Sequence, residues 1–200
     1  MKTKIAVLVS GGGTNLQALI DAQGKTLVSG EIALVVANNA NAYALERAEK
    51  AGIPTAVVLK KECGSQEAFE GKLKEVLTEY GIEVIILAGF MTILTEKFTA
   101  CYPKRILNVH PSLIPSFCGE GFYGLRVHEA ALERGVKLTG ATVHFVNEIP
   151  DGGEIILQKA VEVKDGDTPE ILQRRVMEQA EWKLLPQAVE LVSEEIRRSR

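Results

Sequence analysis

Cysteines are few in this chain and long apolar runs are missing, and each of these features excludes a class of protein. Three cysteines among 200 residues are too few and too scattered for a disulfide framework or a zinc site. No apolar run approaches the ~20 residues needed to span a bilayer, so no membrane segment is expected. A formal net charge of −3 argues against a concentrated basic surface for nucleic acid. These features predict a soluble, cytoplasmic protein.

Short apolar runs alternate with segments of helical spacing through the first half of the chain. A hydrophobic content of 46% in 200 residues suffices for one full core, and no repeat or linker interrupts it, so residues 1–200 are expected to form a single domain. The alternation predicts the α/β class, with a doubly wound and mostly parallel sheet. The expected strands are 4–9, 32–37, 55–59 and 84–88, and the expected helices are 16–21, 42–51 and 66–80.

The pattern changes in the C-terminal part of the chain. Two long β runs, 142–146 and 154–163, are joined by only the seven residues 147–153. Such a short link predicts an antiparallel hairpin added to the parallel sheet. Two helices are expected after it, one starting near residue 169 and one over 182–196.

Asn108 and His110 are the first candidates for chemistry. They follow the apolar segment 105–107, and both lie on one face because side chains alternate along a strand. Pro111 ends the strand, since it has no N–H to donate to a ladder. A neutral donor and a group that titrates near pH 7 are thus placed at a strand's carboxyl end, where open α/β sheets have their active sites. The alternative is a buried histidine that only caps the strand.

A run of three glycines opens the first expected helix, within Ser10–Leu16. Glycines let backbone N–H groups approach an anion, and a helix N-terminus adds positive potential, so we expect a monophosphate here. The dinucleotide pattern fails because Leu16 replaces its last glycine and Asn38-Asn39 stands where an acidic residue is required. The Walker pattern fails because Leu19 occupies the first glycine position before Gly24-Lys25-Thr26. A tight turn without a ligand is the alternative.

Asp151 lies in the expected hairpin loop and is followed by two glycines. Asp-Gly is a common turn pair, so a purely structural role is one interpretation. The other is that Asp151 reaches His110 and favours its imidazolium form, while Asn108 donates to an oxyanion. No recognisable nucleophile elbow places a serine or cysteine beside them, which favours direct acyl transfer between two bound substrates. A structural role is expected for His128 and for His144, with His144 supporting the site from a neighbouring strand.

Taken together, these segments resemble the phosphoribosylglycinamide formyltransferase family over essentially the whole chain. The Asn-x-His-Pro-Ser-Leu segment marks the wider formyl-folate transferase superfamily. The glycine-Thr-Asn loop and the length of 200 residues narrow the resemblance to the family that acts on glycinamide ribonucleotide. The resemblance implies a Rossmann-like formyltransferase fold. It is carried by Val7–Gln17, Leu87–Leu94, Asn108–Pro115, and Gly140–Val146 running on to Asp151-Gly152-Gly153.

The resemblance implies transfer of a formyl group from the co-substrate 10-formyltetrahydrofolate to the amine of glycinamide ribonucleotide, in purine biosynthesis. The tetrahedral intermediate would be stabilised by Asn108, His110 and Asp151. Both partners are small molecules, with no metal, nucleic acid or membrane, and the chain is expected to be a monomer or weak homodimer.

The resemblance also assigns binding residues. Gly13, Thr14 and Asn15 would hold the substrate phosphate, and a Cβ at Gly12 or Gly13 is expected to obstruct it. Glu181 would contact the ribonucleotide. The residues implied to bind the folate are Gln66, Met91, Thr92, Ile93, Leu94, Asn108, Asn147, Glu148, Ile149, Pro150 and Asp151.

Several positions depart from the family pattern. Gln66 and Thr92 stand where arginines are common, which weakens attraction to the anionic folate tail, and Trp182 stands where a histidine is frequent. The loop Phe117–Gly124 is longer than usual and forms either a lid or a surface elaboration.

The alternatives are another enzyme that uses formyltetrahydrofolate, or a nucleotide-binding module without chemistry. The hydrolase and the methionyl-tRNA enzyme of the superfamily usually carry an additional domain, for which 200 residues leave no room. A binding module would need the glycine loop but not the His–Asp pair.

Overall fold

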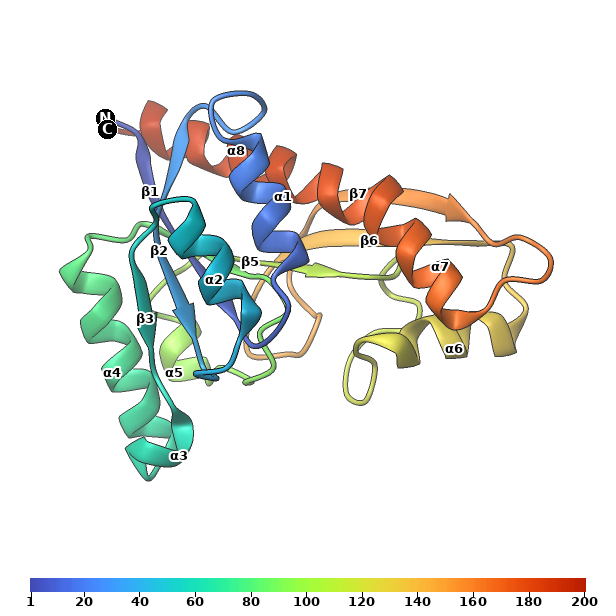
Figure 1. Ribbon diagram of the computed structural model, residues 1–200, viewed down its shortest axis with the longest axis horizontal. Coiled ribbons are helices and arrows are strands. Elements are labelled where there is room, and N and C mark those ends of the chain that lie inside the picture. The colour runs from blue at the N-terminus through green and yellow to red at the C-terminus, as the bar shows by residue number, and fades with distance from the viewer.

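The computed structural model describes all 200 residues, and every strand belongs to one seven-stranded sheet (Figure 1). The strands are β1 (Thr3–Val9), β2 (Gly30–Ala37), β3 (Thr55–Val57), β4 (Val84–Leu87), β5 (Ile106–His110), β6 (Leu138–Phe145) and β7 (Ile155–Glu162). Their spatial order is β3-β2-β1-β4-β5-β6-β7. The pairs from β3 to β5 are parallel, whereas β6 is antiparallel to both β5 and β7. The predicted fold class and the antiparallel hairpin are confirmed.

Eight α-helices and one π-helical turn accompany the sheet. They are α1 (Thr14–Ala22), α2 (Tyr43–Lys50), α3 (Lys60–Cys63), α4 (Gln66–Glu79), α5 (Glu96–Thr99), α6 (Leu125–Arg134), α7 (Pro169–Val176), the π-helical turn (Met177–Glu181) and α8 (Trp182–Arg198). The sequence did not predict α3, α5 or α6. Helices α3 and α5 are a single turn each. Helix α6 starts after Gly124 without a side-chain cap, which is the usual sequence signal for a helix start.

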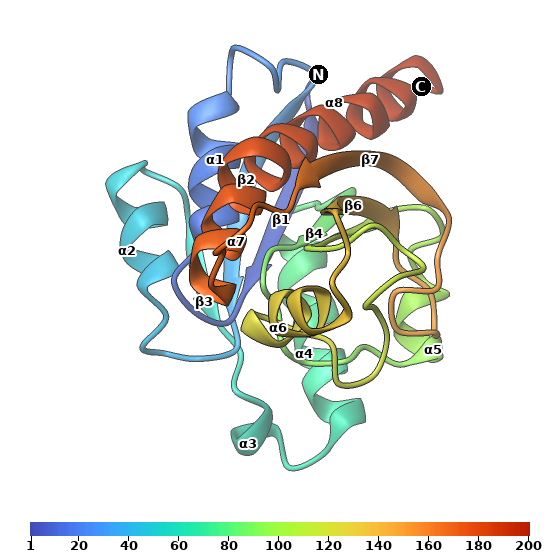
Figure 2. The ribbon, with the colours of Figure 1, turned by 90° about the vertical axis from the view of Figure 1, so that its right-hand side faces the viewer.

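Two cores form because the side chains of the strands alternate. On β1, Ile5, Val7 and Val9 pack with α1, α2 and α8, whereas Ala6 and Leu8 pack with α4 and α5. Figure 2 shows these two groups of helices on opposite sides of the sheet. None of the helices combines the length and the apolar character needed to cross a membrane.

One edge of the sheet gathers the segments that the sequence singled out. Because β1, β4 and β5 run parallel, the glycine loop after β1, the segment after β4 and the Asn-His pair of β5 all emerge at the same carboxyl edge. The C-terminal helices are one continuous run, in which the π-helical turn joins α7 to α8. Two separate helices were expected there, and π turns of this kind often occur at functional sites.

Candidate active site

Asn108, His110 and Asp151 meet at the carboxyl end of β5. His110 Nδ1 lies 3.5 Å from Asp151 Oδ2, and Asn108 Nδ2 donates to Asp151 Oδ1 over 3.4 Å. His110 is only 5% exposed, and the Asp151 side chain is 13% exposed. The structure therefore brings together the three side chains that were predicted to carry the chemistry.

Glycines shape the loop that carries Asp151. Asp151 itself has φ +54°, and the Gly152 N–H donates to the Ile149 carbonyl over 2.9 Å. A Cβ at Gly153 would overlap the carbonyl group of Phe145, so only glycine fits there. The Asp-Gly-Gly sequence thus allows the tight turn between β6 and β7 that holds the carboxylate beside His110.

Asp151 is held as a carboxylate. Burial alone would raise its pKa, but the hydrogen bond to His144, the Gly119 N–H and the charges of His110 and His144 together hold the pKa of Asp151 below its usual value. Negative charge is therefore present beside the His110 ring at neutral pH.

His144 is a fourth member of this cluster. It lies opposite Asn108 in the β5–β6 register, and its Nδ1 is 2.8 Å from the Phe145 carbonyl, so Nδ1 carries a proton. Its Nε2 is 3.2 Å from Asn108 Nδ2 and 3.5 Å from Asp151 Oδ1. The Asn108 amide nitrogen thus has two protein neighbours, and donating to an oxyanion requires exchange of its contact with Asp151.

The long loop 117–124 is anchored directly on His110 and Asp151. His110 Nε2 is 2.8 Å from the Phe117 carbonyl, and the Gly119 N–H donates to Asp151 Oδ2 over 2.9 Å. Phe117 has φ +50°, an unusual conformation for a residue with a side chain. The start of this loop therefore fixes the orientation of both His110 and Asp151, which its sequence did not reveal.

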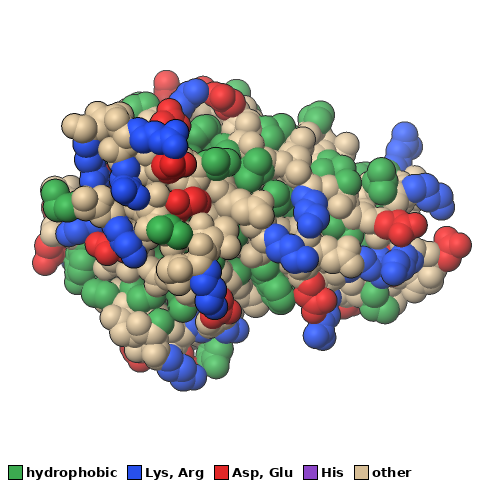
Figure 3. Space-filling model, turned by 90° about the horizontal axis from the view of Figure 1, so that it is seen from above, with side chains coloured by type: hydrophobic (Ala, Val, Ile, Leu, Met, Phe, Trp, Pro, Cys, Tyr) green, Lys and Arg blue, Asp and Glu red, His purple; other side chains and the backbone are tan.

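The remaining histidine lies apart from this cluster. His128, in α6, is fully buried and has no hydrogen-bond partner on either ring nitrogen. Burial, and then the charge of His110, lower its pKa to about 4, so it is neutral at physiological pH. All three histidines are buried, and none is visible on the face seen from above (Figure 3).

The glycine loop ends in the N-terminus of α1. Gly13 precedes the helix with φ +71°, and no side chain caps it. Thr14, Asn15 and Leu16 form the first turn, whose N–H groups have no carbonyl partner within the helix. Free N–H groups at a helix N-terminus can bind an anion, and the phosphate site expected at this loop remains a prediction.

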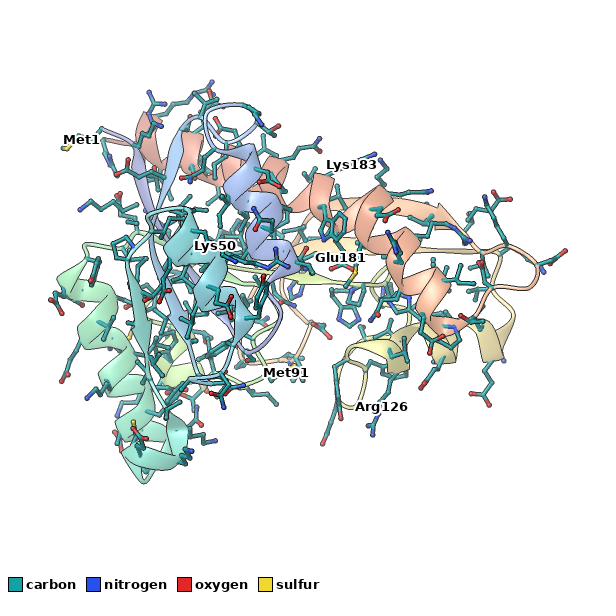
Figure 4. The ribbon with its side chains drawn as sticks, in the orientation of Figure 1. Met1, Lys50, Met91, Arg126, Glu181 and Lys183 are labelled. Carbon is teal, nitrogen blue, oxygen red and sulfur yellow. The ribbon has the colours of Figure 1, made fainter.

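Glu181 reaches this loop from the π-helical turn. Its Oε2 accepts a hydrogen bond from Asn15 Nδ2 over 2.8 Å, and burial raises its pKa to about 6, partly offset by that bond. Asn15 Oδ1 is buried without a partner. Figure 4 shows Glu181 where α7 runs into α8, beside the start of α1.

An open cavity of about 140 Å³ lies next to the catalytic cluster. It is lined by Leu87, Phe90, Met91, Thr92, Ile93, Leu94, Asn108, His144, Val146, Asn147, Glu148, Ile149, Pro150 and Asp151. All the residues implied to bind the folate are among these except Gln66. The exposed side chains of Met91, Ile93 and Ile149 give its mouth an apolar character.

The two positions that depart from the family arginines make internal contacts. Gln66 Nε2 donates to the Ile93 carbonyl and to Glu70, so it braces the pocket wall without lining the cavity. The Thr92 hydroxyl accepts a hydrogen bond from Asn38 Nδ2 over 2.8 Å. Neither residue supplies a positive charge at the pocket.

The glycine loop and the pocket are joined by one hydrogen bond. The Met91 N–H donates to Ser10 Oγ over 2.8 Å, which links the start of the loop to the pocket wall. Ser10 was not predicted as a site residue, and its position immediately before the glycines was the only signal in the sequence.

Comparison with known proteins assigns the family. The model of the formyl transferase family matches residues 3–189. A phosphoribosylglycinamide formyltransferase from Haemophilus influenzae is 42% identical over 96% of this chain and 87% of its own. The chain belongs to the phosphoribosylglycinamide formyltransferase family. The crystal structure of a family member from Symbiobacterium toebii, glycinamide ribonucleotide transformylase 1, superposes with a TM-score of 0.90 at 42% identity, covering 97% of this chain and 89% of that one.

Family members also occur within longer proteins. The trifunctional purine biosynthetic protein adenosine-3 of Gallus gallus is 50% identical over 96% of this chain, which spans only 18% of that relative's length. The family relationship therefore concerns one part of the trifunctional protein.

Gly13 is expected to tolerate no side chain. The Cβ of Gly13→Ala would lie 2.6 Å from the Ala44 Cβ and 2.9 Å from its Cα, at a φ of +71°. This corrects the expectation that a Cβ here obstructs the phosphate, because it would point into α2.

For Gly13→Ala we expect a loss of about 1–3 kcal/mol in the free energy of unfolding, measured with urea. Gly12→Ala is the matched control, since its Cβ meets nothing within 4 Å; equal unfolding midpoints for the two variants would contradict the prediction.

Proposed function

We propose that this chain is an enzyme that transfers the formyl group of 10-formyltetrahydrofolate to the amine of glycinamide ribonucleotide in purine biosynthesis. The observation that carries the proposal is the cluster of Asn108, His110 and Asp151, placed where the glycine loop and an apolar-mouthed cavity meet. A binding module would need the loop alone. The cytoplasmic location and the monomeric or weakly dimeric state remain predictions.

The glycine loop would receive the ribonucleotide. The N–H groups of the first turn of α1, with Gly13, would hold the phosphate. Glu181 and Asn15 would take the ribose, because a buried carboxylate and an unpartnered amide oxygen both accept from hydroxyl groups. Above about pH 6 Glu181 carries its charge, which strengthens such hydrogen bonds.

The cavity beside β5 would receive the pterin. Its lining includes the segments 91–94 and 147–151, whose backbone amide groups would pair with the donors and acceptors of a pterin edge. Asn108 and Asp151 line the same cavity, so the formyl group of a bound folate would lie against them.

The reaction would be a direct transfer. The substrate amine attacks the formyl carbon, and the carbonyl oxygen becomes an oxyanion that Asn108 and protonated His110 stabilise. Asp151 maintains the charge of His110. The bond from the formyl carbon to the folate nitrogen then breaks, and the proton lost by the amine is delivered to that nitrogen.

An assay of formyl transfer tests the proposal. With both substrates present, we expect glycinamide ribonucleotide to be formylated and tetrahydrofolate to be formed in equal amounts. Release of formate without formylated ribonucleotide would indicate a hydrolase and overturn the substrate assignment. Binding of the ribonucleotide without turnover would indicate a binding module.

Gly12→Val tests the phosphate site. A Cβ at Gly12 points into open space beside the loop, so branched side-chain atoms there would meet the anion without disturbing the fold. We expect KM for glycinamide ribonucleotide to rise at least roughly tenfold while KM for the folate changes little, because a lost charge-assisted hydrogen bond is worth about 1.5–3 kcal/mol. A rise confined to the folate KM, or NAD binding as tightly as the ribonucleotide in calorimetry, would contradict the assignment.

A further inference from the structure

Each carbonyl group of residues 10–13, at the glycine loop, accepts a hydrogen bond from within the protein. The Ser10 carbonyl accepts from Asn39 Nδ2 at 3.4 Å, and the Gly11 carbonyl accepts from the Ala44 N–H at 3.0 Å. The next two carbonyls accept from Arg47 Nε at 2.8 Å and from the Gln17 N–H at 2.9 Å. Four consecutive carbonyl groups are thus held by donors from α1, from α2 and from Asn39, which lies between β2 and α2.

These contacts set the direction of the N–H groups. In a planar trans peptide the C=O and the following N–H point in opposite directions. The bond from Arg47 to the Gly12 carbonyl therefore turns the Gly13 N–H toward the opposite side of the loop. A Cβ at Gly11 or Gly12 would meet nothing within 4 Å, so there is open space beside the loop for an anion.

Arg47 is itself held in place by its neighbours. Its Nη1 donates to Gln17 Oε1 over 3.0 Å, and its guanidinium lies 5.0 Å from the centre of the Tyr43 ring. Two of its donor nitrogens are thus used on protein acceptors. A planar guanidinium can hold two acceptors at once, whereas a lysine ammonium on a flexible stem cannot reproduce that geometry.

We infer that Arg47 is a positioning residue for the phosphate site: it fixes the Gly12–Gly13 peptide so that its N–H faces the anion. Without Arg47, this peptide lies between two glycines and can rotate, since glycine populates many backbone conformations. The inference rests on the proposed function, because the anion is taken to be the phosphate of the ribonucleotide. Arg47 acts through the loop and not as a phosphate ligand.

Arg47→Gln and Arg47→Lys test the inference, with Lys50→Gln as the matched control. Lys50 lies one turn along α2 and also stacks on the Tyr43 ring, at 5.5 Å, but makes no hydrogen bond to the loop. Figure 4 shows Lys50 on α2. For Arg47→Gln we expect KM for glycinamide ribonucleotide to rise about tenfold, with KM for the folate and kcat nearly unchanged. Arg47→Lys should recover only part of the loss, and Lys50→Gln should match the wild type.

Calorimetry with ribose 5-phosphate gives a readout that does not depend on formyl transfer. The dissociation constant should rise about tenfold for Arg47→Gln, with a thermal midpoint close to that of the wild type. An unchanged dissociation constant and KM would overturn the inference. So would full recovery in Arg47→Lys, which would show that only a positive charge is needed.

The two proposals fail in different ways. If the wild type binds ribose 5-phosphate but does not formylate the ribonucleotide, the proposed function is wrong, and the ratio of dissociation constants still decides the role of Arg47. If the wild type formylates the ribonucleotide and Arg47→Gln does so with the same KM, only the role of Arg47 is wrong.

Discussion

His110→Ala is expected to lower kcat by at least ~100-fold, the scale of a lost acid–base group. The structure supports this expectation through the two ring nitrogens. Nε2 is 2.8 Å from the Phe117 carbonyl and so carries a proton, while Nδ1 faces Asp151 at 3.5 Å. Nδ1 is therefore the ring nitrogen beside Asp151, a residue that lines the cavity.

His110→Gln separates chemistry from packing. A glutamine amide can still donate to the Phe117 carbonyl, but it cannot carry a proton to the intermediate. Both variants should therefore be similarly inactive, although His110→Gln should unfold at a temperature closer to that of the wild type. Near-normal turnover in either variant, measured by formyl transfer at saturating substrates, would show that His110 is not the acid.

The sequence predicted the parts of the site that depend on local periodicity. Asn108 and His110 share a face because they are two residues apart in a strand, and Pro111 ends that strand. The glycine loop was predicted because glycines before a helix leave N–H groups free for an anion. Asp151 was linked to His110 through the expected hairpin, which requires only a short connection between two β runs.

Other parts of the site depend on contacts between distant segments. The bond from Arg47 to the Gly12 carbonyl exists because α2 packs over the loop, and nothing near Arg47 in the sequence indicates it. The loop 117–119 reaches His110 and Asp151 through backbone groups, which carry no residue signature. The π-helical turn that presents Glu181 adds one residue to a helical turn, a change that a pattern of apolar residues does not resolve.

Asp151→Asn is expected to lower kcat roughly 100-fold at neutral pH, because it removes the negative charge that faces the His110 ring at 3.5 Å. The substitution keeps the shape of the side chain and an oxygen that can accept from the Gly119 N–H. Near-normal turnover of Asp151→Asn, measured by formyl transfer at saturating substrates, would contradict this role.

The thermal stabilities of the wild type and of Asp151→Asn, compared as a function of pH, provide an independent check on the charge of Asp151. The pKa of this carboxyl is lowered in the folded protein: burial opposes the shift, and the contacts with His144, Gly119 and His110 outweigh it. A group with a lowered pKa stabilises the fold above its unfolded pKa, and that contribution is lost as the pH falls through the folded value. The thermal midpoint of Asp151→Asn should thus lie below that of the wild type at neutral pH, and the gap should narrow in acid. A gap that stays constant with pH would mean that the carboxylate does not interact with the histidines as charge, and that Asp151 acts in the loop through its shape alone.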